Sequence, residues 1–146
     1  VAEMGFGLEP CILCLYQRVP YGIVVVLGAF GLLPGAPPDL RWTLTLLCGL
    51  VFLGGAGIAG FHVGVEQHWW PGLEACLAGD GGATSVEALK RELMETQRPP
   101  CDTVPWSLFG ISMAGYNFAA SLVLGLGYAA LGAGGLIRVR KTRRML

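Results

Sequence analysis

The chain is 146 residues long, and 53% of its residues are hydrophobic while only 14% are charged, against about 25% charged residues in an ordinary soluble domain. Its mean hydropathy is +0.58 and its formal net charge is zero. This composition excludes an ordinary soluble domain, gives no reason to expect a nucleic-acid partner, and is typical of a membrane protein.

Three long apolar stretches predict membrane-spanning helices at about 14–33, 42–65 and 106–137, because each supplies the ~20 residues that cross a bilayer. The run from Pro34 to Pro38 separates the first two spans, since proline removes a helix hydrogen-bond donor. Small residues between Gly54 and Gly64 favour close helix contacts, so we expect the second span inside a bundle. The predicted fold class is an all-α integral membrane helical bundle.

The distribution of charge predicts which side of the membrane each segment faces. Five basic residues lie between Arg138 and Arg144, so the positive-inside rule predicts a cytoplasmic tail at 138–146. Counting back through three spans places residues 1–14 and the loop 66–105 on the outer side. Because the chain opens with Val1 and has no signal-peptide pattern, an external N-terminus predicts a preceding span, so that three of a probable four are present.

The long external loop is predicted to carry a short amphipathic helix. Residues 84–87 have capping-box spacing, and Val86, Leu89 and Leu93 then fall on one face, which we expect to lie on the membrane surface. Two prolines at 99 and 100 stop this helix, so we expect Cys101 on an extended, exposed segment.

The outer end of the second span carries aromatic residues that suit the membrane interface. Trp69 and Trp70 fit an interfacial aromatic belt, and Pro71 is expected to end the helix. We read His68 as an interfacial residue beside these indoles rather than as a ligand.

Four of the five cysteines, Cys11, Cys14, Cys76 and Cys101, are predicted on the outer side, where disulfides persist. Cys11 and Cys14 form a C-x-x-C motif at a helix start, where unpaired N–H groups stabilise a thiolate. Cys48 lies in the middle of the second span and is expected to behave as a small buried hydrophobe.

Three ionisable residues near the predicted helix ends are candidate site residues. Arg18 lies one turn after Cys14, so we expect it to share that helix face and to stabilise the Cys14 thiolate. His62 and Glu66 are also one turn apart. They either form a hydrogen-bonded pair in a polar hole of the bundle, or His62 donates to a carbonyl oxygen of a bound ring.

Alternatives to a redox role were weighed for the cysteines. A structural zinc site favours a second close ligand pair, but Cys76 and Cys101 are 25 residues apart, and we expect no metal. Two inert disulfides are a further alternative, whereas a C-x-x-C motif at a helix start favours a redox relay.

Three parts of the sequence resemble the bacterial disulfide bond formation protein B (DsbB) family. They are residues 7–18 (GLEPCILCLYQR), residues 61–66 (FHVGVE), and residues 101–106 with 110–117 (CDTVPW and GISMAGYN). Together they span nearly the whole chain in order. The family has four spans, and the first is absent here.

The resemblance implies a bacterial inner-membrane enzyme that transfers electrons from protein dithiols to quinone. A Cys76–Cys101 disulfide would accept electrons from a soluble periplasmic thioredoxin-like (DsbA-like) oxidase, with Cys76 forming the mixed disulfide. Cys101 would then exchange with Cys11. Cys14 would pass electrons to ubiquinone or menaquinone, with Arg18, His62 and Glu66 as the binding residues.

Two competing functions fit part of the same sequence pattern. A relative of the vitamin K epoxide reductase-like bundle also joins a C-x-x-C motif to quinone chemistry, but its membrane motif usually follows loop cysteines. A non-catalytic scaffold braced by two outer disulfides would need neither a thiolate nor a quinone.

Overall fold

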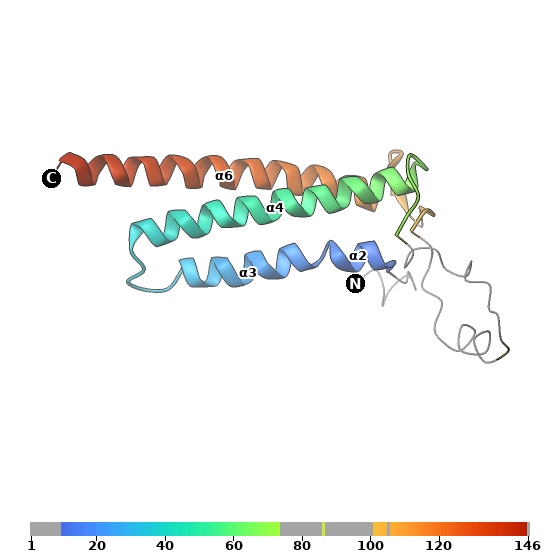
Figure 1. Ribbon diagram of the computed structural model, residues 1–146, viewed down its shortest axis with the longest axis horizontal. Helices are drawn as coiled ribbons and strands as arrows, with labels where there is room; N and C mark the ends of the chain where they lie inside the picture. The colour runs from blue at the N-terminus through green and yellow to red at the C-terminus, as the bar shows by residue number, and fades with distance from the viewer. Residues whose placement is uncertain (1–9, 74–85, 87–100, 105, 146) are drawn as a thin grey trace.

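The structure is a computed structural model that describes residues 10–73, 86, 101–104 and 106–145. Three long helical segments run side by side (Figure 1) and are long and apolar enough to cross a membrane: Ile12–Gly31, Pro38–Glu66 and Met113–Met145. This confirms the predicted all-α membrane bundle. Cys76 and, apart from Val86, the expected loop helix near 85–95 lie outside the described residues.

The first segment consists of two helices, α2 (Ile12–Tyr16) and α3 (Val19–Gly31), joined by a turn at Gln17 and Arg18. Pro20 explains the interruption, because it has no N–H to donate to the carbonyl one turn earlier. Beyond α3, the Gly- and Pro-rich run 31–38 ends the helix as predicted, and Gly35 takes a left-handed φ of 84°.

Helix α4 (Pro38–Glu66) packs against both other segments and has its most extensive contact with α6 (Met113–Met145). The two backbones nearly touch at small residues: a Cβ on Gly132 would lie 2.5 Å from the Leu46 nitrogen, and one on Gly49 would collide with Ala129. Close approach of this kind is how helices pack in lipid.

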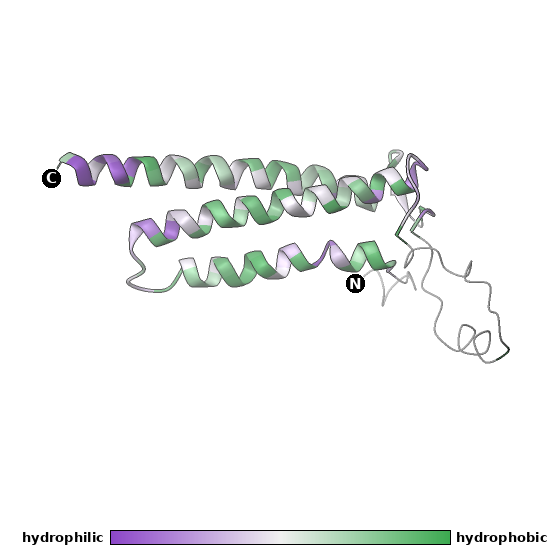
Figure 2. Cartoon of the chain, viewed as in Figure 1, coloured by the Kyte–Doolittle hydropathy of each residue, from purple (hydrophilic) through white to green (hydrophobic). Residues whose placement is uncertain are grey.

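The long helices are mostly apolar along their middle, and hydrophilic residues gather at the C-terminal end of α6, at the start of α4 and in the turn after α4 (Figure 2). Large side chains point away from the neighbouring helices, and Val25, Val123 and Ile137 are 71%, 70% and 68% exposed. Such a surface suits contact with lipid chains rather than water.

Helix α4 ends at Glu66, five residues before Pro71, so the prediction that this proline ends the helix is wrong. His68 adopts a left-handed φ of 58°, the Trp69 N–H donates to the Gly64 carbonyl, and the His68 N–H donates to the Val65 carbonyl. These bonds form a Schellman motif. The chain then turns back, and Trp70 stacks on Phe61 with ring centroids 5.8 Å apart.

A short hairpin precedes α6, which begins at Met113 rather than near Trp106 as expected. Its strands, β1 (Ser107–Leu108) and β2 (Ile111–Ser112), pair antiparallel, and Phe109 and Gly110 both have positive φ, as a two-residue type I′ turn requires. Ser112 then accepts the Gly115 N–H at the start of α6. The hairpin therefore fixes Ser112 at the cysteine-bearing end of the bundle.

Candidate functional site

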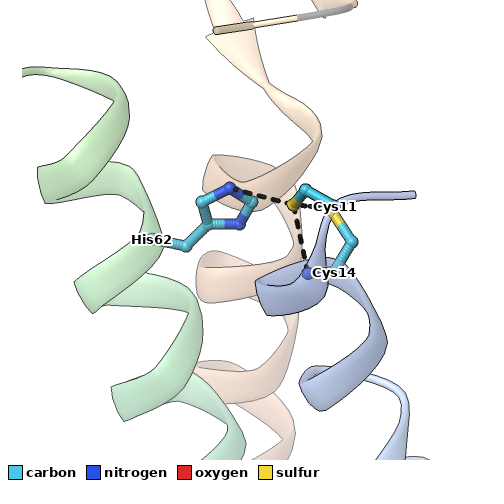
Figure 3. A group of neighbouring side chains, drawn as sticks. All are labelled: Cys11, Cys14 and His62. Atoms are coloured by element: carbon cyan, nitrogen blue, oxygen red, sulfur yellow. Dashed lines mark hydrogen bonds between the residues drawn. The ribbon is translucent and has the colours of Figure 1, made fainter. Parts of the chain in front are cut away.

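The C-x-x-C motif occupies the start of α2, and Cys11 itself caps this helix. The Cys14 N–H donates to the Cys11 sulfur at 3.3 Å, as a helix cap does, while the two sulfur atoms lie 2.9 Å apart. Cys11 is buried, whereas Cys14 is half-buried. Both sulfurs are therefore on one side of the helix start, with Cys14 the more accessible (Figure 3).

His62 approaches this pair from α4 (Figure 3), with its Nε2 atom 3.6 Å from the Cys11 sulfur. Hydrogen bonding from Cys14, supported by the nearby His62, lowers the pKa of Cys11 from 9.0 to about 4, and this outweighs the opposing effect of burial. The sequence predicts the thiolate on Cys14, whereas the Cys14 N–H and His62 Nε2 beside the Cys11 sulfur favour a charge on Cys11, and which cysteine carries it stays a prediction.

The Cys11–His62 contact is supported by a chain of two amides, the buried Gln17 and the half-buried Asn117. The Gln17 Nε2 atom lies 2.7 Å from His62 Nδ1, and the Asn117 amide donates to Gln17 Oε1 at 2.5 Å. The Tyr21 hydroxyl in turn donates to Asn117 Oδ1 at 2.5 Å. Because the Gln17 amide nitrogen donates to Nδ1 of His62, Nδ1 is an acceptor and carries no proton. The imidazole proton therefore lies on Nε2 and faces Cys11.

Glu66 lies one turn from His62, as predicted, and both side chains are buried, with 7% and 2% of their surface exposed. The Glu66 carboxylate is 3.9 Å from His62 Nε2 and accepts the Ser112 hydroxyl at 2.5 Å. The pair therefore connects α4 to the hairpin before α6. His62 and Glu66 thus share one polar cluster, but each has its hydrogen bond with another residue, Gln17 and Ser112, and the choice between the two alternatives stays a prediction.

Cys101 is 1% exposed, so the expectation that this cysteine is exposed is wrong, although residues 102–104 after it are exposed. The cysteine packs in the same buried cluster as Cys11, Leu13 and Val65, and its backbone interacts with His62. Packing against the ends of α2 and α4 covers this side chain. Three of the four predicted redox cysteines thus lie at one end of the bundle, and Cys76 lies outside the described residues.

The remaining predicted residues have different surroundings. Arg18 is exposed in the turn between α2 and α3, and Cys48 is buried in α4, in agreement with a small packing residue. His68 is exposed beside Trp69.

Sequence reasoning missed the polar partners of His62 and Glu66, namely Gln17, Asn117, Ser112 and Tyr21. Gln17 and Asn117 are uncharged polar residues inside or beside apolar spans, where their amides need partners within the bundle. The free-energy cost of an amide without a hydrogen-bond partner in the bundle is the signal in the sequence that points to Gln17 and Asn117. Their pairing was not readable, because the Gln17–Asn117 contact joins positions 100 residues apart.

Comparison with known proteins gives a consistent result. A family model described as "Disulfide bond formation protein DsbB" matches residues 1–131. The chain is 32% identical over 148 residues to the Disulfide bond formation protein B of Dechloromonas aromatica, an alignment that covers 93% of this chain and 79% of the relative. It is 30% identical over 132 residues to the protein of the same name from Xylella fastidiosa, covering 85% and 75%. No solved structure gives a significant match.

Proposed function

The chain belongs to the DsbB family of disulfide bond formation proteins, and from this premise we propose that it is a protein dithiol:quinone oxidoreductase of the bacterial inner membrane. The observation that carries the proposal is the Cys11 sulfur, which receives the Cys14 N–H and lies beside Cys14 Sγ and His62 Nε2. Three such contacts favour the thiolate, which is the reactive and leaving form in disulfide exchange.

The first half of the reaction takes electrons from a soluble periplasmic thioredoxin-like dithiol protein. A thiolate of this DsbA-like partner attacks Cys76 of a Cys76–Cys101 disulfide, which forms a mixed disulfide and releases Cys101 as a thiolate. The second partner thiol then attacks the mixed disulfide and releases Cys76. The partner leaves oxidised, and two electrons have entered the chain.

The second half moves those electrons to the C-x-x-C motif. The Cys101 thiolate attacks Cys11 of a Cys11–Cys14 disulfide, so that a Cys101–Cys11 bond forms and Cys14 is released. The packing of Cys101 and Cys11 in one buried cluster supports this exchange. The Cys76 thiolate then attacks Cys101, which re-forms the Cys76–Cys101 disulfide and releases Cys11, and a stabilised charge on Cys11 makes it a good leaving group in this step.

The site has residues that fit a quinone at the membrane boundary. Cys14 is half-buried and Arg18 is exposed at the start of the first span, so a ring that approaches from lipid meets both a sulfur and a cation. When bound, ubiquinone or menaquinone supplies a two-electron oxidant that restores the disulfide. Arg18 would hold a ring oxygen and orient it towards Cys14.

His62 and Glu66 are the deeper members of this proposed site. The Nε2 proton of His62 faces Cys11, so the same proton is available to share between the thiolate and a ring oxygen. The Glu66 carboxylate, held by Ser112, lies 3.9 Å from that nitrogen and completes the polar side of the proposed site.

The proposal is tested by measuring oxidation of a reduced thioredoxin-like protein by the purified chain in detergent with added quinone. Cys14→Ser is expected to lose at least 100-fold in turnover, because no disulfide can form at the motif, while Cys48→Ser serves as a matched control with normal turnover. Circular dichroism checks that both variants are folded. Full activity of a folded Cys14→Ser variant would remove the mechanism.

A further inference from the structure

The reduced C-x-x-C motif and His62 form a compact set of three metal-ligating atoms. Cys11 Sγ, Cys14 Sγ and a ring nitrogen of His62 all lie within 4.8 Å of one another, and the described residues contain this one such group. We propose that the reduced protein binds one Zn²⁺ ion through these three side chains, and that the ion holds the enzyme in an inactive state. The binding site stands on its own geometry, and the inhibition rests on the proposed function.

The separations agree with zinc coordination. With Zn–S of ~2.3 Å and Zn–N of ~2.05 Å at tetrahedral angles, a sulfur and a nitrogen ligand are about 3.6 Å apart. Cys11 Sγ and His62 Nε2 are 3.6 Å apart. The two sulfurs, at 2.9 Å, must open to about 3.8 Å, which a small rotation of the half-buried Cys14 side chain provides.

Charge favours the same ion. Two thiolates and a neutral imidazole cancel the 2+ charge of zinc, so the complex is neutral in a buried site, where an uncompensated charge is costly. Thiolate and imidazole ligands also select zinc over Mg²⁺ or Ca²⁺, which prefer oxygen. Three protein ligands leave the fourth position to water.

The surroundings of His62 supply the outer contact that zinc-binding histidines need. With Nε2 on the metal, Nδ1 carries the proton and requires an acceptor. Gln17 is within 2.7 Å of Nδ1, and its amide presents the oxygen after rotation of its terminal group. The Asn117 amide, paired with Gln17, rotates with it and keeps both groups hydrogen-bonded.

Metal binding and catalysis exclude each other in this arrangement. At neutral pH Cys11 is already a thiolate, so binding releases the thiol proton of Cys14 and forms two Zn–S bonds, with no change in oxidation state. Disulfide formation uses the same two sulfurs and removes both ligands. The oxidised protein therefore has no site, and zinc on the reduced protein blocks its re-oxidation by quinone.

The test measures zinc content after dialysis of the purified chain against Zn²⁺ under anaerobic conditions, in the reduced and oxidised forms. The reduced wild type and the Cys48→Ser control are expected to keep one ion per chain, while the oxidised form keeps none. Cys14→Ser and His62→Gln are expected to bind at least tenfold more weakly. Cobalt substitution should give a thiolate-to-metal charge-transfer band in the wild type, which is lost in Cys14→Ser.

Two outcomes would overturn the site: equal zinc in the oxidised and reduced forms, or full retention in both Cys14→Ser and His62→Gln, which would place the ion elsewhere. Zinc binding is read without turnover, so an inactive chain that binds zinc would refute only the proposed oxidase. An active chain whose quinone-dependent turnover is unaffected by bound zinc would refute the inhibition.

Discussion

Cys11 differs from an ordinary buried cysteine in having its sulfur surrounded by donors. The Cys14 N–H and thiol come from its own helix, and His62 comes from α4. Since each donor favours the charged form, the pKa of Cys11 falls to about 4 although burial opposes this change. The residue is thus held ready as an attacking or leaving group at neutral pH.

The first prediction concerns the pH dependence of the reduced protein. Alkylation of Cys11 should reach half its maximal rate well below pH 9, close to pH 4, and His62→Ala should move this midpoint upward because a donor is lost.

Between about pH 4 and pH 9 the folded protein binds fewer protons than the unfolded chain, so its stability relative to Cys11→Ser should rise with pH. This contribution is complete above pH 9 and is lost below pH 4. An alkylation midpoint at pH 9 would contradict the lowered pKa of Cys11.

Gln17 gives a second prediction, because it orients His62 through a direct hydrogen bond. Gln17→Leu keeps the side-chain size but leaves His62 Nδ1 and the Asn117 amide without their partner. We expect a loss of about 1–3 kcal/mol in the free energy of unfolding and an upward shift of the Cys11 alkylation midpoint. Gln67→Leu, at an exposed position after α4, is the matched control and should change neither. An unshifted midpoint in Gln17→Leu would show that Gln17 only packs.

Residue-level prediction from sequence succeeded where spacing along one helix decides the contact. His62 and Glu66 were paired correctly because residues four apart share a helix face. The same rule assigned Arg18 to Cys14, but the helix is interrupted between them, and the amide chain that supports His62 crosses three segments. Contacts between segments depend on how the helices are rotated about their axes, which no local spacing determines.

At the level of helices, contact between α4 and α6 depends on particular glycines rather than on a general abundance of small residues. The sequence drew attention to Gly54 through Gly64, whereas backbone contact occurs at Gly49 on α4 and at Gly125 and Gly132 on α6. The presence and approximate bounds of three spans were predictable from hydropathy. The glycines that form the contact were not, because this depends on the partner helix.

The third prediction uses two neighbouring glycines of α6 as a matched pair. A methyl group on Gly132 would lie 2.5 Å from the Leu46 nitrogen, while one on Gly134 meets no atom within 4 Å. Gly132→Ala should therefore lower stability in detergent by about 1–3 kcal/mol through separation of the helices. Gly134→Ala should be neutral or slightly stabilising, since alanine favours helix. Thermal unfolding of both variants distinguishes these outcomes, and equal melting temperatures would refute the contact.

On the scale of the whole molecule, the basic residues and the cysteine pair lie at opposite ends of the bundle. The basic end of α6 and the loop before α4 lie at one end, and the cysteine-bearing segments lie at the other (Figure 1). An ion pair between Arg143 and Asp39 joins the two elements at the basic end. Because the pair is largely exposed, it contributes little to stability. The positive-inside rule predicts a larger effect of these charges on orientation, with the basic end on the cytoplasmic side.

This polarity leads to the last prediction, that the cysteine end faces the periplasm. In a chain whose natural cysteines are replaced by serine, Trp69→Cys adds a thiol at the exposed site end, and Arg140→Cys adds one in the basic segment. A membrane-impermeant maleimide applied to intact spheroplasts should label the first variant only, and both after lysis. The reverse pattern would place the cysteine pair in the reducing cytoplasm, where disulfides do not persist. The proposed oxidase needs its soluble partner and its basic end on opposite sides of the membrane, so this labelling tests the arrangement independently of any turnover.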